Sequence, residues 1–147
     1  MLVRAAVAGV AVVGALGLMA TPAQAAGTVK LVKVVYDSPG SDTGSNGSLN
    51  DEYVVLKNTK TESVQLEGWT LRDESRHVYT FPRVKLGAGN KLKVHTGRGS
   101  NSSSHVFWDY GWYVWNNTSD TAELRKPSGT LKDSCRWTST GSGYTAC

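Results

Sequence analysis

The stretch Leu66-Glu67-Gly68-Trp69-Thr70-Leu71-Arg72-Asp73 decides the fold, because it places a sharp turn directly before an alternating apolar run. Glycine adopts turn conformations without steric cost, so Gly68 suits a chain that turns into a buried strand. Alternate side chains of a strand share one face, which puts Trp69, Leu71 and Asp73 together. We therefore expect Trp69 and Leu71 to fill the space between two packed sheets.

Similar short runs rich in Val, Leu, Tyr, Trp and Thr recur on both sides of this stretch, separated by Gly, Asn, Asp, Ser and Pro. Such spacing is typical of an all-β protein, and hardly any segment has helical periodicity. A parallel α/β sheet would need crossover helices, and none can be placed. The sequence predicts an antiparallel β-sandwich of about eight to ten strands. These strands are expected in residues 28–36, 52–58, 64–66, 69–73, 77–81, 91–96, 106–115, 121–126 and 130–137.

The beginning of the chain differs in character from the rest. Arg4 is followed by an almost wholly apolar stretch of small residues, then by Pro22 and the triplet Ala23-Gln24-Ala25. A charged start, an apolar middle and an A-x-A end are typical of a secretory signal peptide. We predict residues 1–25 as a cleaved signal peptide and residues 26–147 as one exported domain. Retention of the apolar stretch as a membrane anchor is the alternative.

The charge balance is mildly basic. The chain has 16 Lys and Arg against 12 Asp and Glu, and loss of Arg4 would leave 15 against 12, a net charge of +3. Lysines such as Lys30, Lys57 and Lys93 are scattered in the sequence, with no run of like charges. This excess mildly favours anionic partners, but the scatter argues against a strong nucleic-acid site.

Two cysteines, Cys135 and Cys147, lie near the end of the chain. An even number of cysteines in an exported chain predicts a disulfide bond. That bond would pin the polar Gly/Ser-rich tail back onto the last predicted strand. Two free thiols or a metal-binding pair are the alternatives, although no third or fourth soft ligand lies nearby in the sequence.

Four motifs occur in an order and spacing that are specific together. They are Val29–Tyr36 with the loop Asp37-Ser38-Pro39-Gly40-Ser41-Asp42, then Asn50-Asp51-Glu52-Tyr53-Val54-Val55-Leu56-Lys57-Asn58, then Leu66–Asp73 with Tyr79-Thr80-Phe81-Pro82, and finally Trp115-Asn116-Asn117 through Asp120, Ala122 and Leu124. The last three are similar to the E-[WY]-V-x-[IL]-x-N, L-x-G-W-x-L-x-D and W-N-N-x-x-D-x-[AV]-x-L patterns of one family. Over nearly all of residues 29–137 the chain resembles the lamin tail domain.

The resemblance implies an immunoglobulin-like antiparallel β-sandwich, and a secreted bacterial single-domain member of a family that occurs in many exported proteins. Its motif residues are expected to be structural, namely Trp69, Leu71, Trp115, Asn116, Asn117 and Asp120. Asn116 and Asn117 tolerate the left-handed conformation that a hairpin turn needs, and Asp120 can accept backbone N–H bonds at the exit of that turn. The cysteine pair is not part of the family pattern.

Signatures of catalysis are lacking in the sequence. The histidines, His77, His95 and His105, lie apart from one another, and no H-E-x-x-H motif or G-x-S-x-G elbow is present. We interpret His77 and His95 as surface or rim residues of strands. The chain is therefore predicted to have no enzymatic activity and no catalytic residues.

The acidic loop between the first two predicted strands is a candidate metal site. Asp37, Asp42, Asp51 and Glu52 supply the hard oxygen ligands that Ca²⁺ prefers. The loop does not match an EF-hand, because the residues after Asp42 lack its acidic alternation. A solvated loop in which Asp and Asn cap turns is the alternative, so we otherwise expect no cofactor.

The densest aromatic cluster lies in residues 106–115. In an extended segment Trp108, Tyr110 and Trp112 would line one face, and Tyr113 and Trp115 the other. One set must face the core, and an exposed set would stack on sugar rings or bases, or contact a protein. The first three are therefore candidate ligand-stacking residues.

The sequence as a whole favours a secreted, non-enzymatic adaptor that binds a partner at the cell exterior. The family resemblance implies this role, with an unidentified extracellular protein or cell-wall component as the partner. Carbohydrate or cell-wall binding through the aromatic cluster is one alternative. Weak nucleic-acid binding through the positive charge is another, and a hydrolase is a third.

Overall fold

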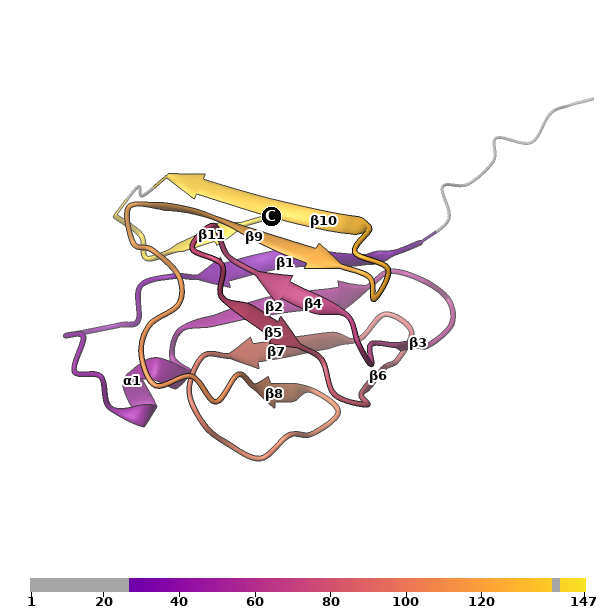
Figure 1. Cartoon of the computed structure of the whole chain (residues 1–147), viewed down its shortest axis with the longest axis horizontal. Helices are drawn as coiled ribbons and strands as arrows, with labels where there is room; N and C mark the ends of the chain where they lie inside the picture. Colours follow the sequence, from indigo (N-terminus) through magenta and orange to yellow (C-terminus); the bar gives the residue numbers. More distant parts are fainter. Residues whose placement is uncertain (1–26, 139–140) are drawn as a thin grey trace, which may run out of the picture.

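The computed structural model describes residues 27–138 and 141–147, and the predicted all-β sandwich is confirmed in them (Figure 1). Two main sheets enclose one apolar core. The predicted signal peptide, residues 1–25, lies outside the described residues. No described helix is long and apolar enough to cross a membrane.

The larger sheet has five strands in the order β11-β1-β2-β7-β8. Their bounds are Tyr144–Ala146, Val29–Val35, Tyr53–Asn58, Lys91–His95 and His105–Phe107. The pairs of β1 with β11, of β1 with β2 and of β2 with β7 are antiparallel, as the sequence predicts. A bulge in β1 between Leu31 and Lys33 shifts its register by one residue.

The second sheet has four antiparallel strands in the order β10-β9-β4-β5. Their bounds are Leu131–Thr138, Ser119–Arg125, Thr70–Arg72 and Val78–Thr80. Two further strands of two residues each, β3 (Val64–Gln65) and β6 (Lys85–Leu86), pair with one another at one end of the sandwich.

The core contains the inward residues that strand alternation predicts. Trp69 and Leu71 are 8% and 0% exposed, which confirms that they fill the space between the sheets. Strands β2, β7 and β9 bury alternate residues in the same way, and the fully or almost fully buried set includes Val54, Leu56, Leu92, Val94, Ala122 and Leu124. Burial of apolar side chains is the main favourable contribution to folding.

Strands β7 and β8 form the one parallel pair among the described strands, against the expectation of a purely antiparallel sandwich. Residues 96–104 connect them without a helix. The close approach of this loop to β8 depends on Gly99, where an added Cβ would lie 2.4 Å from the Phe107 ring. Because β8 has only three residues, a loop can place it beside β7 without the usual crossover helix.

Two segments differ from the sequence prediction. The expected strand 106–115 ends at Phe107, and the residues that follow form an irregular loop. The predicted loop 37–50 contains a helix of one turn, α1 (Asn46–Asn50), which Ser45 caps by accepting a hydrogen bond from the Ser48 amide. A single turn is too short to produce an apolar periodicity, so this helix has no periodic signal in the sequence.

The predicted disulfide between Cys135 and Cys147 is present. Cys135 is 5% exposed and belongs to β10 in the four-stranded sheet. Cys147 follows β11, which pairs with the edge of β1 in the five-stranded sheet. The bond therefore joins the two sheets, and β11 covers the edge of β1 that would otherwise be open to other strands.

Removal of this bond in a Cys135→Ala/Cys147→Ala variant is expected to lower the free energy of unfolding by about 3 kcal/mol, because the unfolded chain gains the freedom of the closed loop. Urea denaturation of wild type and variant, each with and without reductant, measures the difference. Reductant should destabilise only the wild type, and equal curves for both proteins would contradict a stabilising role.

Candidate functional site

A fully buried acidic side chain lies directly before β2. Glu52 is 0% exposed. One of its oxygens accepts hydrogen bonds from the Thr96 hydroxyl at 2.5 Å and the Val114 amide at 2.9 Å, and the other accepts from the Trp115 amide at 3.4 Å. The carboxylate thus fixes the end of the irregular loop, whose Val114 and Trp115 enter the core.

Burial raises the pKa of Glu52 to about 7 from an ordinary value of 4.5, although its hydrogen bonds with Thr96, Val114 and Trp115 lower it and the negative charge of Asp42 raises it further. Removal from water disfavours the ionised form, and this effect is larger than the effect of the donors. Glu52 therefore gains or loses a proton near neutral pH.

The candidate calcium ligands do not gather into one cluster. Asp37, Asp42 and Asp51 are exposed, whereas the carboxylate of Glu52 is directed to backbone amides inside the protein. Asp42 accepts a hydrogen bond from Ser38. Within residues 27–138 and 141–147, no group of three or more His, Cys, Asp or Glu is placed to share a metal ion. The geometry thus offers a structural role for Glu52 and no support for the calcium hypothesis.

A Glu52→Gln variant is expected to reduce the pH dependence of stability. Since the folded pKa lies above the unfolded value, the contribution of Glu52 is fully present below about pH 4.5 and is lost as the pH rises through about 7. Between pH 5 and pH 8 the wild type should lose about 2 kcal/mol more than the variant, given about 1.4 kcal/mol per pKa unit. Urea denaturation at both pH values measures this, with the exposed Glu67→Gln as control. An equal change in the free energy of unfolding between the two pH values in wild type and Glu52→Gln would refute this prediction.

The aromatic cluster does not lie on one extended strand, so its predicted division into two faces is wrong. Trp108 is partly buried and packs against the core beside Tyr79 and Trp115. Tyr110 and Trp112 are 36% and 60% exposed. Of the three candidate stacking residues, the structure therefore leaves only these two accessible to a ligand.

The turn before β9 is held by a carboxylate rather than by left-handed asparagines. Neither Asn116 nor Asn117 has a positive φ, contrary to prediction. Asp120, which is 0% exposed, accepts hydrogen bonds from the amides of Asn116, Glu74 and Thr121. Its predicted role as an acceptor of backbone N–H groups is thus present, and it joins this turn to the one between β4 and β5.

The histidines lie in two places. His77 is hydrogen-bonded through Nδ1 to buried Asp73 at 2.5 Å, and this contact closes the turn before β5. His95 and His105, ten residues apart in sequence, meet on adjacent strands with 2.8 Å between His95 Nε2 and His105 Nδ1. The backbone oxygen of Asn50 accepts from His95 Nδ1, so His105 is the donor when both rings are neutral.

Burial lowers the pKa of His95, and the nearby positive groups of His105 and Lys93 lower it further, while the hydrogen bond to Asn50 and the charge of Asp51 raise it. The pair is a contact that sequence reasoning missed. The parallel β7–β8 register that creates it has no local signal in the sequence.

The outer side of the five-stranded sheet gathers many of the cations that the sequence scatters. We call this surface the basic outer face, and its members are Lys30, Lys33, Val35, Tyr53, Val55, Lys57, Lys91, Lys93, His95, His105, Phe107 and Tyr144. No member is acidic. None of its lysines forms an ion pair with a carboxylate in the described part of the chain.

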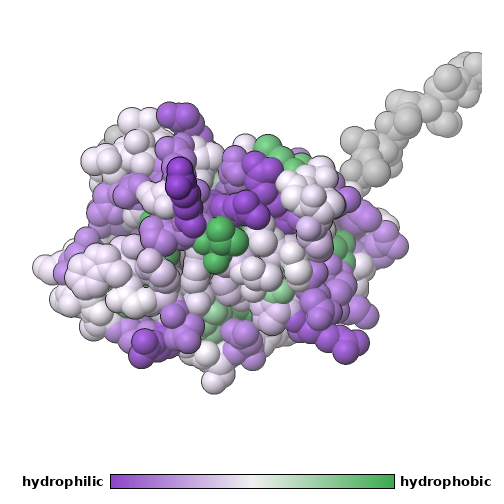
Figure 2. Space-filling model, in the orientation of Figure 1, coloured by the Kyte–Doolittle hydropathy of each residue, from purple (hydrophilic) through white to green (hydrophobic). Residues whose placement is uncertain are grey.

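The outer side of the four-stranded sheet differs in charge pattern. There Arg125 pairs with Glu123 at 2.8 Å, and Thr121 donates a hydrogen bond to Glu74. Charges of both signs thus compensate one another on that sheet. In the view of Figure 2, hydrophobic residues form only small separate patches between hydrophilic ones. The two outer sides therefore differ in the balance of their charges.

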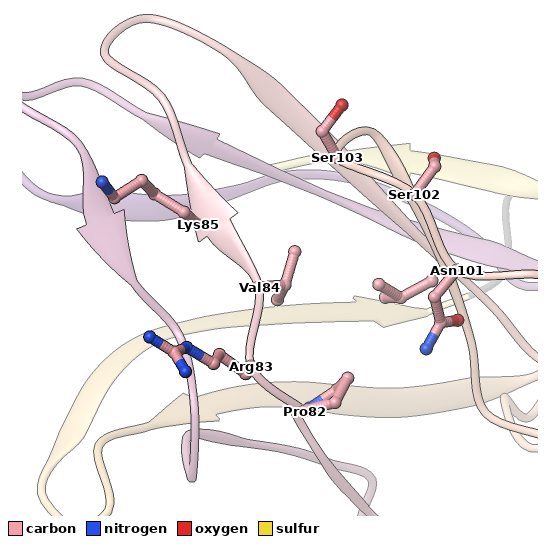
Figure 3. A pocket seen from close by; sticks show the side chains of 8 residues that line it. Pro82, Arg83, Val84, Lys85, Asn101, Ser102 and Ser103 are labelled. Carbon is pink, nitrogen blue, oxygen red and sulfur yellow. The ribbon is translucent and has the colours of Figure 1, made fainter.

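A hollow between β6 and the loop before β8 is a further candidate, with Pro82, Val84 and Val106 among its lining residues. Figure 3 shows that Arg83 and Lys85 extend to the side away from Asn101 and the neighbouring serines. Because these polar groups do not converge on one point, the hollow does not have the arrangement of a ligand site.

A family model described as Lamin Tail Domain matches residues 22–139 of the chain. The chain belongs to the lamin tail domain family. No curated protein matches it. Cys147 lies beyond the matched residues, so the disulfide that pins β11 is an addition to the part of the lamin tail domain that the match covers.

The motif residues by which the chain resembles this family have structural roles. In this lamin tail domain Trp69, Leu71 and Trp115 are buried in the core, Glu52 holds backbone amides, and Asp120 holds two turns. None of these side chains is free to contact a large partner. A binding surface is therefore to be sought among side chains that point outward, including those of the motif strands such as Lys57.

Proposed function

We propose that this chain is a secreted, non-enzymatic binding module that attaches to an anionic component at the cell exterior through its basic outer face. The observation that carries the proposal is the strand register. It aligns Lys30, Lys57 and Lys91 directly across three strands, with Lys33 and Lys93 in the next row. Surfaces of one charge sign steer and bind partners of the opposite sign.

Two further features support a location outside the cell. The disulfide is of a kind that forms and persists in oxidising compartments. The sequence before residue 27 has the pattern of a secretory signal peptide. A role in attachment also agrees with the lamin tail domain family, whose motif residues here are structural.

The proposal predicts that a Lys57→Gln/Lys91→Gln/Lys93→Gln variant binds the insoluble envelope fraction of the producing cells roughly tenfold more weakly than wild type. The matched control is Lys85→Gln/Lys126→Gln/Arg136→Gln, which removes the same charge from exposed positions elsewhere. Sedimentation with the envelope fraction gives the bound share of each protein. Equal loss in both variants would show that only net charge matters and would contradict a defined surface.

A second candidate function is stacking on sugar rings, which the exposure of Tyr110 and Trp112 favours. A Trp112→Ala variant should then lose retention on insoluble peptidoglycan and keep its stability within about 0.5 kcal/mol, because the side chain is mostly in water. Pull-down and urea denaturation measure the two quantities. Unchanged retention would exclude this candidate.

A further inference from the structure

We infer that the partner of the basic outer face is an anionic polysaccharide, a chain of sugars with repeated carboxylate, sulfate or phosphate groups. This inference rests on the proposed function and names the partner of the same surface. It follows from three properties of the face, namely the alignment of its lysines, the use of its aromatic rings and the kind of cation it presents.

The lysines are aligned in rows that run across the strands. Register places Lys30 opposite Lys57 and Lys57 opposite Lys91, and it places Lys33 and Lys93 on either side of Val55. Adjacent strands lie about 4.8 Å apart. Like charges directly opposite on neighbouring strands destabilise a sheet. A linear polyanion lying along such a row would remove this repulsion by placing its own charges between the ammonium groups.

The aromatic rings of the face are already in contact with other side chains. Lys93 Nζ lies 4.5 Å from the centroid of the Tyr53 ring, and Lys33 Nζ lies 4.4 Å from that of Tyr144. The ring of His95 stacks on Phe107 at 4.9 Å. Attraction to the ring face holds each ammonium group in place. The ring faces that these contacts cover are therefore not open to the bases of a single-stranded nucleic acid, which binds by stacking on open aromatic rings, although Tyr144 as a whole is 49% exposed.

The type of basic side chain on the face also favours one class of partner over the others. The face presents lysine and histidine, whereas arginine is the residue preferred for nucleic-acid phosphates and for protein interfaces. Lysine is depleted at protein interfaces, and the apolar members Val35 and Val55 are only 8% and 7% exposed, which leaves Tyr144, at 49%, as the one large exposed ring among the described residues of the face. A surface of lysine point charges on a flat sheet favours a flexible anionic polymer over a folded protein.

The test measures the affinity of the purified chain, with its disulfide intact, for dextran sulfate, polygalacturonate and neutral dextran by biolayer interferometry. Wild type is expected to bind the two charged polymers. The affinity of Lys57→Gln/Lys91→Gln/Lys93→Gln should be roughly tenfold weaker than that of wild type, and the affinity of Lys85→Gln/Lys126→Gln/Arg136→Gln should be weaker by less than about threefold. Affinity should also fall steeply when salt rises from about 50 to about 200 mM. Neutral dextran is the control for charge, because it has the same sugar backbone as dextran sulfate without the sulfate groups.

Oligothymidine and poly-glutamate form the two competing arms. Tighter binding of oligothymidine or poly-glutamate than of both polysaccharides would overturn the inference in favour of nucleic acid or acidic protein. Suppose that no polysaccharide binds, while Lys57→Gln/Lys91→Gln/Lys93→Gln still binds the envelope fraction more weakly than wild type. The inference then fails and the proposed function stands. If the two triple variants behave alike in every arm, both fail.

Discussion

The alternation of side chains along β2 and β7 is the constraint on which most of this structure depends. Val54, Leu56, Leu92 and Val94 can be buried only if their neighbours in the two strands point outward. The same register that builds the core therefore sends lysines, tyrosine and histidine to the opposite side of the sheet. A slip of one residue would expose the core residues and bury the charges, so core and outer face are fixed together.

Buried carboxylates and one covalent bond hold the remaining segments to this frame. Glu52 holds the irregular loop by its backbone amides, and Asp120 holds two turns at the other sheet. These loops have little regular backbone pairing of their own, and a buried amide without an acceptor is costly. The bond between Cys135 and Cys147 then fixes β11 along the open edge of β1.

The residues that stabilise the core and the turns are thus distinct from the charged residues of the proposed binding face. The residues that place the chain in the lamin tail domain family lie inside the protein, where they satisfy the core and the turns. Lysines without an ion pair in the described part of the chain lie on the outer side of the five-stranded sheet, where Lys57 occupies a variable position of the second motif. Members of such a family can therefore share a framework and differ in partner, because exposed strand positions change at little cost in folding energy. In this chain the charged residues at the outward positions of the five-stranded sheet are basic.

The sequence by itself determined the all-β class, the buried sides of the strands, the disulfide and the family. Each depends on local patterns such as the alternation around Trp69 and Leu71, or on motifs of a few neighbouring residues. It did not reveal the contact of His95 with His105, the hydrogen bonds that Glu52 accepts from the loop before β9, or the collection of distant lysines on one face. Those features depend on which strands become neighbours and in what register. Long-range pairing is decided by the packing of the whole core, so only the tertiary structure could place Lys30 beside Lys57 and Lys57 beside Lys91.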